Sequence, residues 1–102
     1  MPIVSVLGDV CSSHDCFPSR PNDQASPNVF AGGKPIHRQG DHWVTHCCTD
    51  PPDYPHGCHD SVLASGSSTV YINNKQCARI GDPIACGSTD AGPGVPSVIV
   101  GG

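Results

Sequence analysis

Residues 68–82 read STVYINNKQCARIGD, a stretch with the signature of a β-hairpin. In its first half, apolar Val70 and Ile72 alternate with more polar neighbours, and this period of two predicts a β-strand. Asn73 and Asn74 tolerate the positive φ that a two-residue hairpin turn requires. The return segment alternates in the same way and ends in a Gly-Asp pair, so the stretch predicts two short antiparallel strands.

The same pattern occurs again at residues 27–41, at a constant offset of 41 residues. Val29 corresponds to Val70, and a Lys, an Arg and a closing Gly-Asp pair follow at matching positions in both copies. A Gly-Gly pair replaces the two asparagines, and glycine adopts positive φ without strain. The repetition therefore predicts two equivalent hairpins.

The two chain ends supply the missing pieces of this pattern. Residues 3–9 match the second strand of a unit, and residues 96–102 match a first strand that ends at its turn pair. Pairing of these halves would complete a third unit and leave no open sheet edge. We predict a single all-β domain over residues 1–102, composed of half hairpin 3–9, hairpin 27–41, insertion loop 42–60, hairpin 68–82 and half hairpin 96–102.

Composition excludes several classes of function. The net charge is −4 with five Lys and Arg, so no basic patch is available to neutralise phosphates and we expect no nucleic-acid partner. No apolar run approaches the roughly 20 residues of a membrane helix. The first residues lack the features of a signal peptide. We therefore expect synthesis in a cytoplasm, with any export carried out by another machine.

Seven cysteines and six histidines indicate a metal site. A domain of this size has a marginal hydrophobic core and needs additional stabilisation from a metal ion, disulfides or a partner. Where no signal peptide is present, metal binding is a better default than a disulfide framework. Most of these residues fall in three segments between the hairpins, 10–25, 42–60 and 83–96, which we expect to be irregular loops that must be tied down.

The repeated unit resembles that of the PAAR-repeat proteins. The tetrad that names this family corresponds to Pro-Ile-His-Arg at 35–38 and Gln-Cys-Ala-Arg at 76–79, which keep the arginine. Further marks are GSSTV at 66–70, three Gly-Asp pairs, and IACGS at 84–88. The resemblance covers essentially the whole chain, with residues 47–58 as an insertion.

The resemblance implies a small cone of short β-hairpins with pseudo-threefold symmetry and a metal-pinned apex. Such cones sit, one copy per trimer, on the blunt end of a trimeric β-helical spike. They form the membrane-piercing tip of a phage tail baseplate or of a type VI secretion system, and contact the target cell envelope transiently. The protein would then be made in a bacterial cytoplasm and would become a structural part of a virion tail tip or a component secreted by the type VI system. An apolar, strand-lined base containing Val29, Val70 and Val98 would face the spike.

Counting along the repeat places three candidate ligands at equivalent positions. His14 and His46 lie six residues after the glycine of a Gly-Asp pair, and Cys86 lies five residues after one. Equivalent loops should converge near the pseudo-axis. His59 precedes its hairpin much as Cys86 precedes the last strand. Imidazole nitrogen and thiolate sulfur are preferred ligands of zinc, so the four predict one structural zinc ion, the three-His, one-Cys set for which PAAR proteins are known. The His-rich set also suits iron.

Other ligand sets remain open at this stage. His56 lies three residues from His59 and is the reserve ligand, while Cys47 adjoins His46 and is a substitute for it. A local site within the insertion would use His46, Cys48, Cys58 and His59. Spare cysteines also allow disulfides after release, either Cys11 with Cys16 or Cys47 with Cys58, because spacing alone does not settle pairing.

The remaining polar residues of interest are assigned structural roles. Cys77 is expected to pack as a small apolar residue. His37 and His42 are expected to be exposed or hydrogen-bonded instead of binding metal. The aspartate of each Gly-Asp pair is expected to accept a hydrogen bond from a loop N–H.

Two alternative functions are considered beside the spike tip. A zinc-dependent hydrolase would need an open coordination position and a base, for which Asp15 and Asp60 are candidates. A small zinc-binding adaptor module would need neither. The sequence contains no His-Glu-x-x-His, Gly-x-Ser-x-Gly or phosphate-loop motif, and it ends inside the repeat, so we expect no enzyme and no appended toxin domain.

Overall fold

A computed structural model describes residues 2–14, 17–48 and 57–102. Within those ranges every regular element is a β-strand, and no helix is long and apolar enough to cross a membrane. In chain order the strands are β1 (Ile3–Val4), β2 (Val10–Cys11), β3 (Phe30–Ala31), β4 (Lys34–Pro35), β5 (His42–Cys48), β6 (Gly57–Val62), β7 (Tyr71–Ile72), β8 (Lys75–Gln76), β9 (Asp90–Gly92) and β10 (Val95–Ile99).

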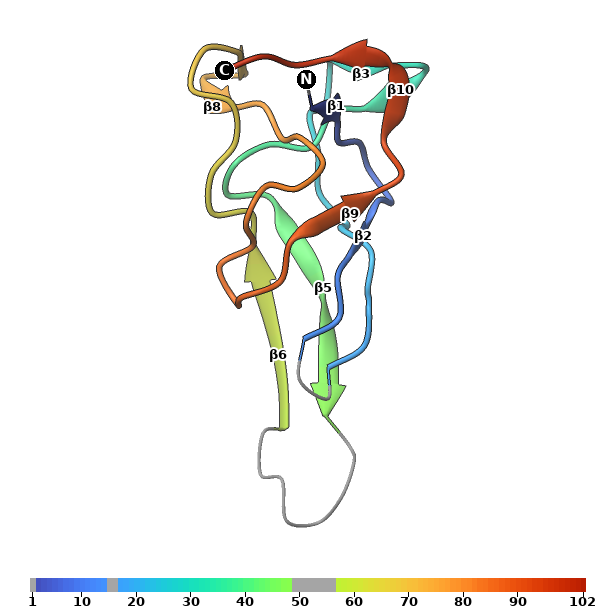
Figure 1. The fold of residues 1–102 in the computed structure, drawn as a ribbon, viewed down its shortest axis with the longest axis vertical. Coiled ribbons are helices and arrows are strands. Elements are labelled where there is room, and N and C mark those ends of the chain that lie inside the picture. The colour runs from blue at the N-terminus through green and yellow to red at the C-terminus, as the bar shows by residue number, and fades with distance from the viewer. Residues whose placement is uncertain (1, 15–16, 49–56) are drawn as a thin grey trace.

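The strands associate in antiparallel pairs, which are β1–β10, β2–β9, β3–β4, β5–β6 and β7–β8. The hairpins β3–β4 and β7–β8 are the two repeated units. Their turn residues have positive φ, 57° and 78° at Gly32 and Gly33, and 54° and 67° at Asn73 and Asn74. These values are what a two-residue turn between twisted strands requires. The pairing of β1 with β10 joins the two chain ends, which lie at the same end of the molecule (Figure 1).

A cyclic set of backbone hydrogen bonds makes the threefold relation explicit. Ser5 N–H donates to the carbonyl of Ala78 at 3.0 Å, and Ala78 N–H donates to that of His37 at 3.0 Å. His37 N–H closes the ring by donating to the carbonyl of Ser5 at 3.1 Å. All three residues are fully buried and occupy equivalent positions in the three units. The ring ties the three sides together about one axis.

The three Gly-Asp pairs close the units in the same way. In each, the carboxylate accepts a hydrogen bond of 2.8–2.9 Å from the backbone N–H three residues earlier. This confirms the capping role expected for Asp9, Asp41 and Asp82. In the second and third units that earlier residue is an arginine, which also forms an ion pair with the aspartate.

Two apolar clusters lie inside the three-sided body. One contains Val4, Val6, Ala31, Ile36, Cys77 and Val100, and the other contains Cys11, Trp43, Leu63, Ala78 and Ile84. Val29, Val70 and Val98 are partly buried against the first cluster. Cys77 is 1% exposed and packs as the small apolar residue that the sequence predicts.

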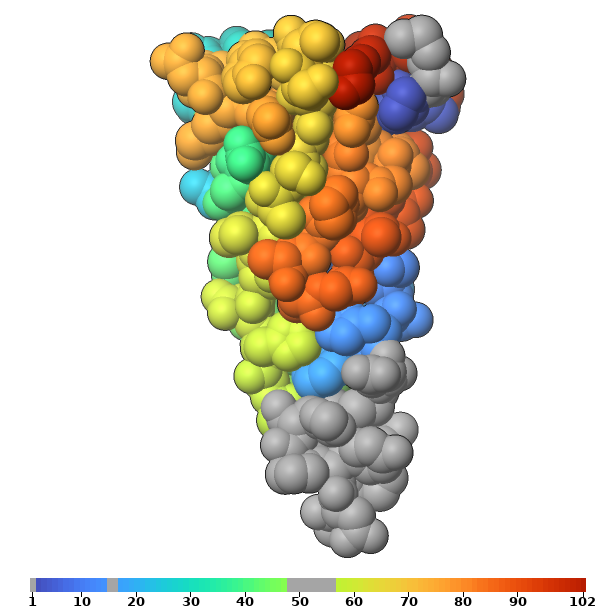
Figure 2. All heavy atoms as spheres, turned by 60° about the vertical axis from the view of Figure 1, so that its left-hand side comes forward, coloured from blue at the N-terminus to red at the C-terminus, as the bar shows by residue number. Residues whose placement is uncertain are grey.

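The described part of the chain tapers along its long axis, with principal-axis extents of 43 × 24 × 23 Å. The wide end carries β1, β3, β8 and β10, while β5 and β6 run away from it (Figure 1). Figure 2 shows the described surface narrowing from the end that carries the C-terminus toward β6. The fold is therefore an all-β cone of short hairpins with pseudo-threefold symmetry, as the sequence predicts.

The expectation that residues 42–60 form an irregular loop is wrong for much of that segment. Residues 42–48 and 57–62 are β5 and β6, which pair with a register shift between Trp43 and His46. The loops expected at 10–25 and 83–96 also contribute β2 and β9, which pair with each other. Strands of two or three residues are too short to show a period of two, and the ligand residues of β5 conceal its alternation.

Candidate metal centre

Four side chains from separate segments meet toward the narrow end of the cone. The ligand atoms of His14, His46, His59 and Cys86 all lie within 4.8 Å of one another. His46 is buried, and the other three are half-buried. The set is the one that counting along the repeat predicts, and the structure brings all four side chains together.

The antiparallel pairing of β5 and β6 positions two of the four. His46 and His59 are register partners, and their Nε2 atoms face each other at 2.6 Å. His46 Nδ1 lies 2.8 Å from the carbonyl oxygen of Pro18, which can only accept a hydrogen bond. Nδ1 therefore carries the proton of the neutral ring, and Nε2 presents a lone pair toward His59. Such a contact requires a shared proton or a cation.

Backbone hydrogen bonds position the other two ligands. His14 exchanges backbone hydrogen bonds with Phe17, N–H to carbonyl in both directions, at 3.2 and 2.8 Å. Cys86 lies in a turn closed by the N–H of Gly87, which donates to the carbonyl of Ile84 at 2.9 Å. The preceding residue, Ala85, donates its N–H to Val62 at 3.0 Å, which anchors this turn to the end of β6.

A ring of neighbouring groups orients the imidazoles. The hydroxyl of buried Ser88 is hydrogen-bonded to His14 Nδ1, which leaves Nε2 for the cluster. The ring of Phe17 packs against those of His46 and His59, with centroid separations of 5.0 and 4.2 Å. Sequence reasoning missed these partners of the ligands, since nothing in the spacing links Ser88 to a residue 74 positions away.

Electrostatics favour the neutral, ligating form of His59, the more exposed member of the His46–His59 pair. Burial lowers the pKa of His59, and the neighbouring rings of His46 and His14 lower it further. A neutral imidazole is the form that binds a metal ion.

The donor set fits zinc. Three imidazole nitrogens and one thiolate are a complete tetrahedral set, with Zn–N of about 2.0–2.1 Å and Zn–S of about 2.3 Å in structural sites. Atoms that already lie within 4.8 Å of one another need small rotamer changes to reach a common ion. Four ligands leave no open position, and hydrogen bonds to two of the rings supply the outer support that such sites require.

The structure excludes two of the alternative ligands, Cys47 and Cys58. Cys47 and Cys58 form a disulfide, so neither substitutes for a histidine nor joins a local site. Their pairing confirms one of the two disulfides considered. The other is wrong, because Cys11 is a buried free thiol. His56, Asp15 and Cys16 lie outside the described residues, and Cys48 is described only as the last residue of β5.

The two remaining described histidines stand apart from the cluster. His37 is buried, and its Nδ1 lies 2.7 Å from the carbonyl oxygen of Gln24. His42 bridges two carboxylates, with Nδ1 2.6 Å from Asp23 and Nε2 2.7 Å from Asp60. The hydrogen bond to Asp60, and then that to Asp23, raise the pKa of His42. Both histidines are hydrogen-bonded, as the sequence analysis expects.

Comparison with known proteins identifies the family. The model of the PAAR motif family matches residues 5–90. The chain belongs to the PAAR motif family. The match spans the threefold ring, all three Gly-Asp pairs and the four clustered side chains of this PAAR chain.

Two curated relatives of the chain are toxins from Pseudomonas aeruginosa. The NAD(P)(+) glycohydrolase toxin Tse6 and, from another strain, the (p)ppApp synthetase toxin Tas1 are each 34% identical over 65 residues. The alignment covers 64% of this PAAR chain and 15% of each toxin. The similarity therefore concerns a small part of these relatives.

Proposed function

We propose that residues 1–102 act as one PAAR-like domain that caps and sharpens the trimeric β-helical spike of a contractile injection machine. The strongest support for this proposal is the cyclic set of backbone hydrogen bonds among Ser5, His37 and Ala78, which gives one chain three equivalent sides. A pseudo-threefold cone can present similar contacts to all three subunits of a trimer, so one copy suffices per spike. Membership of the PAAR family and the tapered shape support the same role.

The wide end carries chemically matched apolar side chains on the three sides. Phe30 on β3 and Tyr71 on β7 are each 55% exposed, and Ile99 on β10 is 50% exposed. They occupy equivalent positions next to Val29, Val70 and Val98, which pack inward. We propose this exposed trio, with its valine neighbours, as the surface that contacts the blunt end of the spike. Burial of large apolar side chains is the main source of affinity at such interfaces.

We further propose that His14, His46, His59 and Cys86 hold one structural zinc ion that orders the narrow end of the cone. A closed four-ligand set contributes folding energy and leaves no position for substrate. Metal binding would join the segments at the edge of the second apolar cluster, against which Cys86 packs. The ion's task would be mechanical, because a tip driven through a target cell envelope must keep its shape.

The geometry gives less support to a zinc-dependent hydrolase. Asp60, one of the two bases considered, is held by His42 Nε2 at 2.7 Å and is not a member of the ligand cluster. A small adaptor module needs no tapered, three-sided body. The toxin relatives favour a type VI secretion setting over a phage tail, and we propose that the domain is exported with its spike.

The proposal is tested by mixing the purified chain with a trimeric β-helical spike and measuring the stoichiometry by light scattering and native mass spectrometry. We expect one copy per trimer. Replacing Phe30 and Tyr71 by Ser should abolish the complex. Val62→Ser is the matched control, because Val62 is an exposed apolar residue (38%) on β6, away from the wide end. Binding in three copies, or equal binding by both variants, would contradict the spike-tip assignment.

A further inference from the structure

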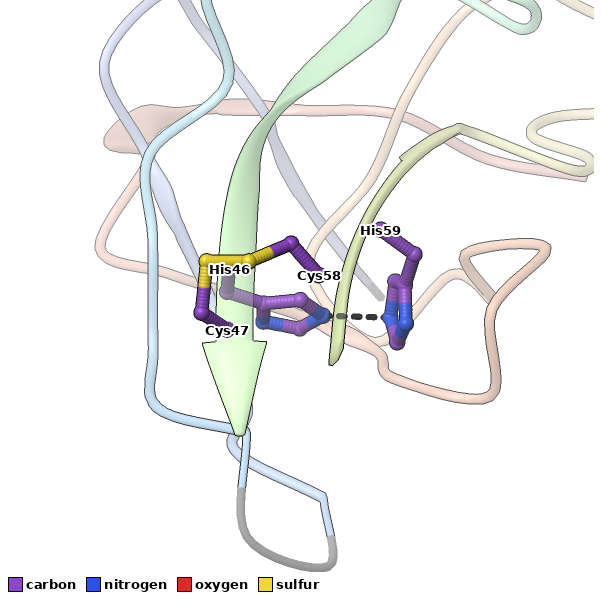
Figure 3. The surroundings of a disulfide bond; sticks show 4 residues. All are labelled: His46, Cys47, Cys58 and His59. Carbon is purple, nitrogen blue, oxygen red and sulfur yellow. Dashed lines mark hydrogen bonds between the residues drawn. A yellow bond between two sulfur atoms is a disulfide. The ribbon is translucent and has the colours of Figure 1, made fainter. Parts of the chain in front are cut away.

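The disulfide Cys47–Cys58 and the histidine pair occupy neighbouring rungs of one ladder. Cys47 is the register partner of Cys58, and His46 is the register partner of His59 (Figure 3). The disulfide lies one residue further from the body of the protein than the two ligands. Any separation of β5 from β6 at the cysteines is therefore transmitted directly to the histidines.

The two rungs project to opposite faces of the hairpin, because successive side chains of a strand alternate. The imidazoles turn toward Phe17 and His14, with ring centroids 4.2 Å apart for His59 and Phe17. Cys58 is exposed on the other face, and Cys47 is half-buried. The cysteines consequently do not compete for the metal, and the disulfide is accessible to redox partners.

One face of this part of the hairpin is supported, because Phe17 packs against His46 and His59. The cysteine rung lies beyond the buried apolar cluster on β5. The buried cluster that contains Trp43 ends three residues before His46, and the ladder register shifts between them. On the β6 side, the exposed residues Gly57 and Cys58 contribute no apolar packing. Covalent closure of the cysteine rung therefore supplies a restraint that packing does not.

We propose that the redox state of Cys47 and Cys58 controls how tightly the metal centre holds its ion, and we call this pair a redox lock. When the two cysteines form a disulfide, the ion is retained tightly. When they are a dithiol, the ion is released readily. This inference rests on the proposed zinc site. In the locking step, both thiols lose their hydrogens to a small-molecule disulfide RS–SR. One S–S bond forms between Cys47 and Cys58, and two RSH are released. Two electrons pass from the protein to the oxidant, so atoms and charge balance.

The lock would follow the route of an exported protein. Cytosolic thiols keep such a pair reduced, which allows the metal to exchange while the chain is being folded and loaded. Outside the cell the pair oxidises, and loss of metal slows where no replacement ion is supplied. The device preserves the metal-held tip after it leaves the compartment in which it was assembled.

The test measures the rate at which zinc passes from the loaded full chain to a chromogenic chelator. Oxidised protein, verified by intact mass and thiol counting, is compared with protein reduced by a phosphine that binds zinc weakly. We expect release to be roughly 10- to 100-fold faster from the dithiol, the usual size of an effect on the groups that orient metal ligands. The double variant Cys47→Ser/Cys58→Ser should release zinc as fast as the reduced parent, and the reductant should not change its rate.

The remaining outcomes distinguish a failure of the redox lock from a failure of the proposed zinc site. Equal release from oxidised and reduced parent overturns the lock and leaves the zinc site in place. A double variant that still responds to reductant as strongly as the parent also overturns it, because another thiol pair would then be responsible. Failure of either form to bind zinc stoichiometrically overturns the zinc site and the lock together. The comparison of oxidised and reduced parent stands even if the variant does not fold.

Discussion

The wide and narrow ends of this PAAR domain are held together by different forces. At the wide end, Val4, Val6 and Ile36 pack in one apolar cluster, and a closed ring of backbone hydrogen bonds joins the three sides. Toward the narrow end, three imidazoles and a thiol lie beside the buried ring of Phe17, and a disulfide joins β5 to β6. A cone has too little interior near its apex to bury a large core, so a covalent bond and, as we propose, a metal ion supplement the hydrophobic effect there.

The three sides also differ from one another in the middle of the molecule. Asp41 and Asp82 each pair with an arginine three residues earlier, at 2.9 Å. In the first unit that position is Val6, so Asp9 has no such cation and relies on Ser5 and backbone N–H groups. The repeat therefore reproduces the backbone closely, while the charge balance varies between units.

Removing the metal should have the largest effect on stability and should affect the narrow end before the wide end. Structural zinc contributes on the order of 10 kcal/mol in small zinc-binding domains. Chelation, or Cys86→Ser, is expected to lower Tm sharply, and added zinc should raise the Tm of the parent far more than that of the variant. Hydrogen exchange should accelerate at His46 and His59 before it does at Ser5. An unchanged melting curve after verified metal removal would contradict the metal-held tip.

Truncating the apolar cluster should affect the wide end by a smaller amount. Ile36 is 6% exposed, and Ile36→Ala should cost about 2–5 kcal/mol through lost burial and a cavity. Ile99→Ala is the matched control, because Ile99 is 50% exposed and its truncation should change stability little. Denaturant unfolding measures both, and zinc affinity at fixed pH should be similar in the two variants. A large loss of affinity in Ile36→Ala would show that the two ends are coupled.

A buried carboxyl between the two ends should make stability depend on pH. Burial, reinforced by the charge of Asp9 and opposed by the Ser5 hydroxyl, raises the pKa of Asp90 from 3.8 to about 7. Its Oδ2 has no hydrogen-bond partner among the described residues. The folded state therefore keeps a proton on Asp90 that the unfolded state loses near pH 3.8. The contribution of protonated Asp90 to the free energy of unfolding is fully present below pH 3.8 and is lost as the pH rises to about 7.

The variant Asp90→Asn should remove this dependence. Above pH 7 it should be more stable than the parent by on the order of 2 kcal/mol, the cost of a buried polar group without a partner. The measurement is the difference in unfolding free energy between variant and parent across pH 4 to 8, since the histidine ligands affect both proteins equally. A difference that does not vary with pH would show that Asp90 stays ionised.

The smallest effect is expected at the exposed His42 bridge. Its raised pKa means that the ion pairs stabilise the fold below the ordinary value of 6.5 and that this contribution is lost as the pH rises above the folded value. The side chain is 34% exposed, so solvent screening limits the contribution to below about 1 kcal/mol. Asp23→Asn should lower the pKa of His42 in an NMR titration while leaving zinc affinity unchanged. An unaltered titration would show that Asp23 is not a partner in solution.

Sequence alone determined the repeat, the hairpin turns and the choice of the four side chains that lie together. A constant offset aligned β3–β4 with β7–β8, because hairpins are local and their turn residues carry their own conformational preference. Counting forward from each Gly-Asp pair selected His14, His46 and Cys86, because repeated units place equivalent residues near a common axis. His59 was added by its distance from the strand that follows it.

Only the tertiary structure decided the features that depend on distant segments. The choice of Cys47–Cys58 over Cys11–Cys16 depends on the register of β5 and β6, which the irregular spacing of ligands concealed. The support of His14 by Ser88, and the burial of Asp90 beside Asp9, join residues more than seventy positions apart. Local propensity carries no information about such contacts, since they arise when three sides close around a shared axis and the chain ends meet.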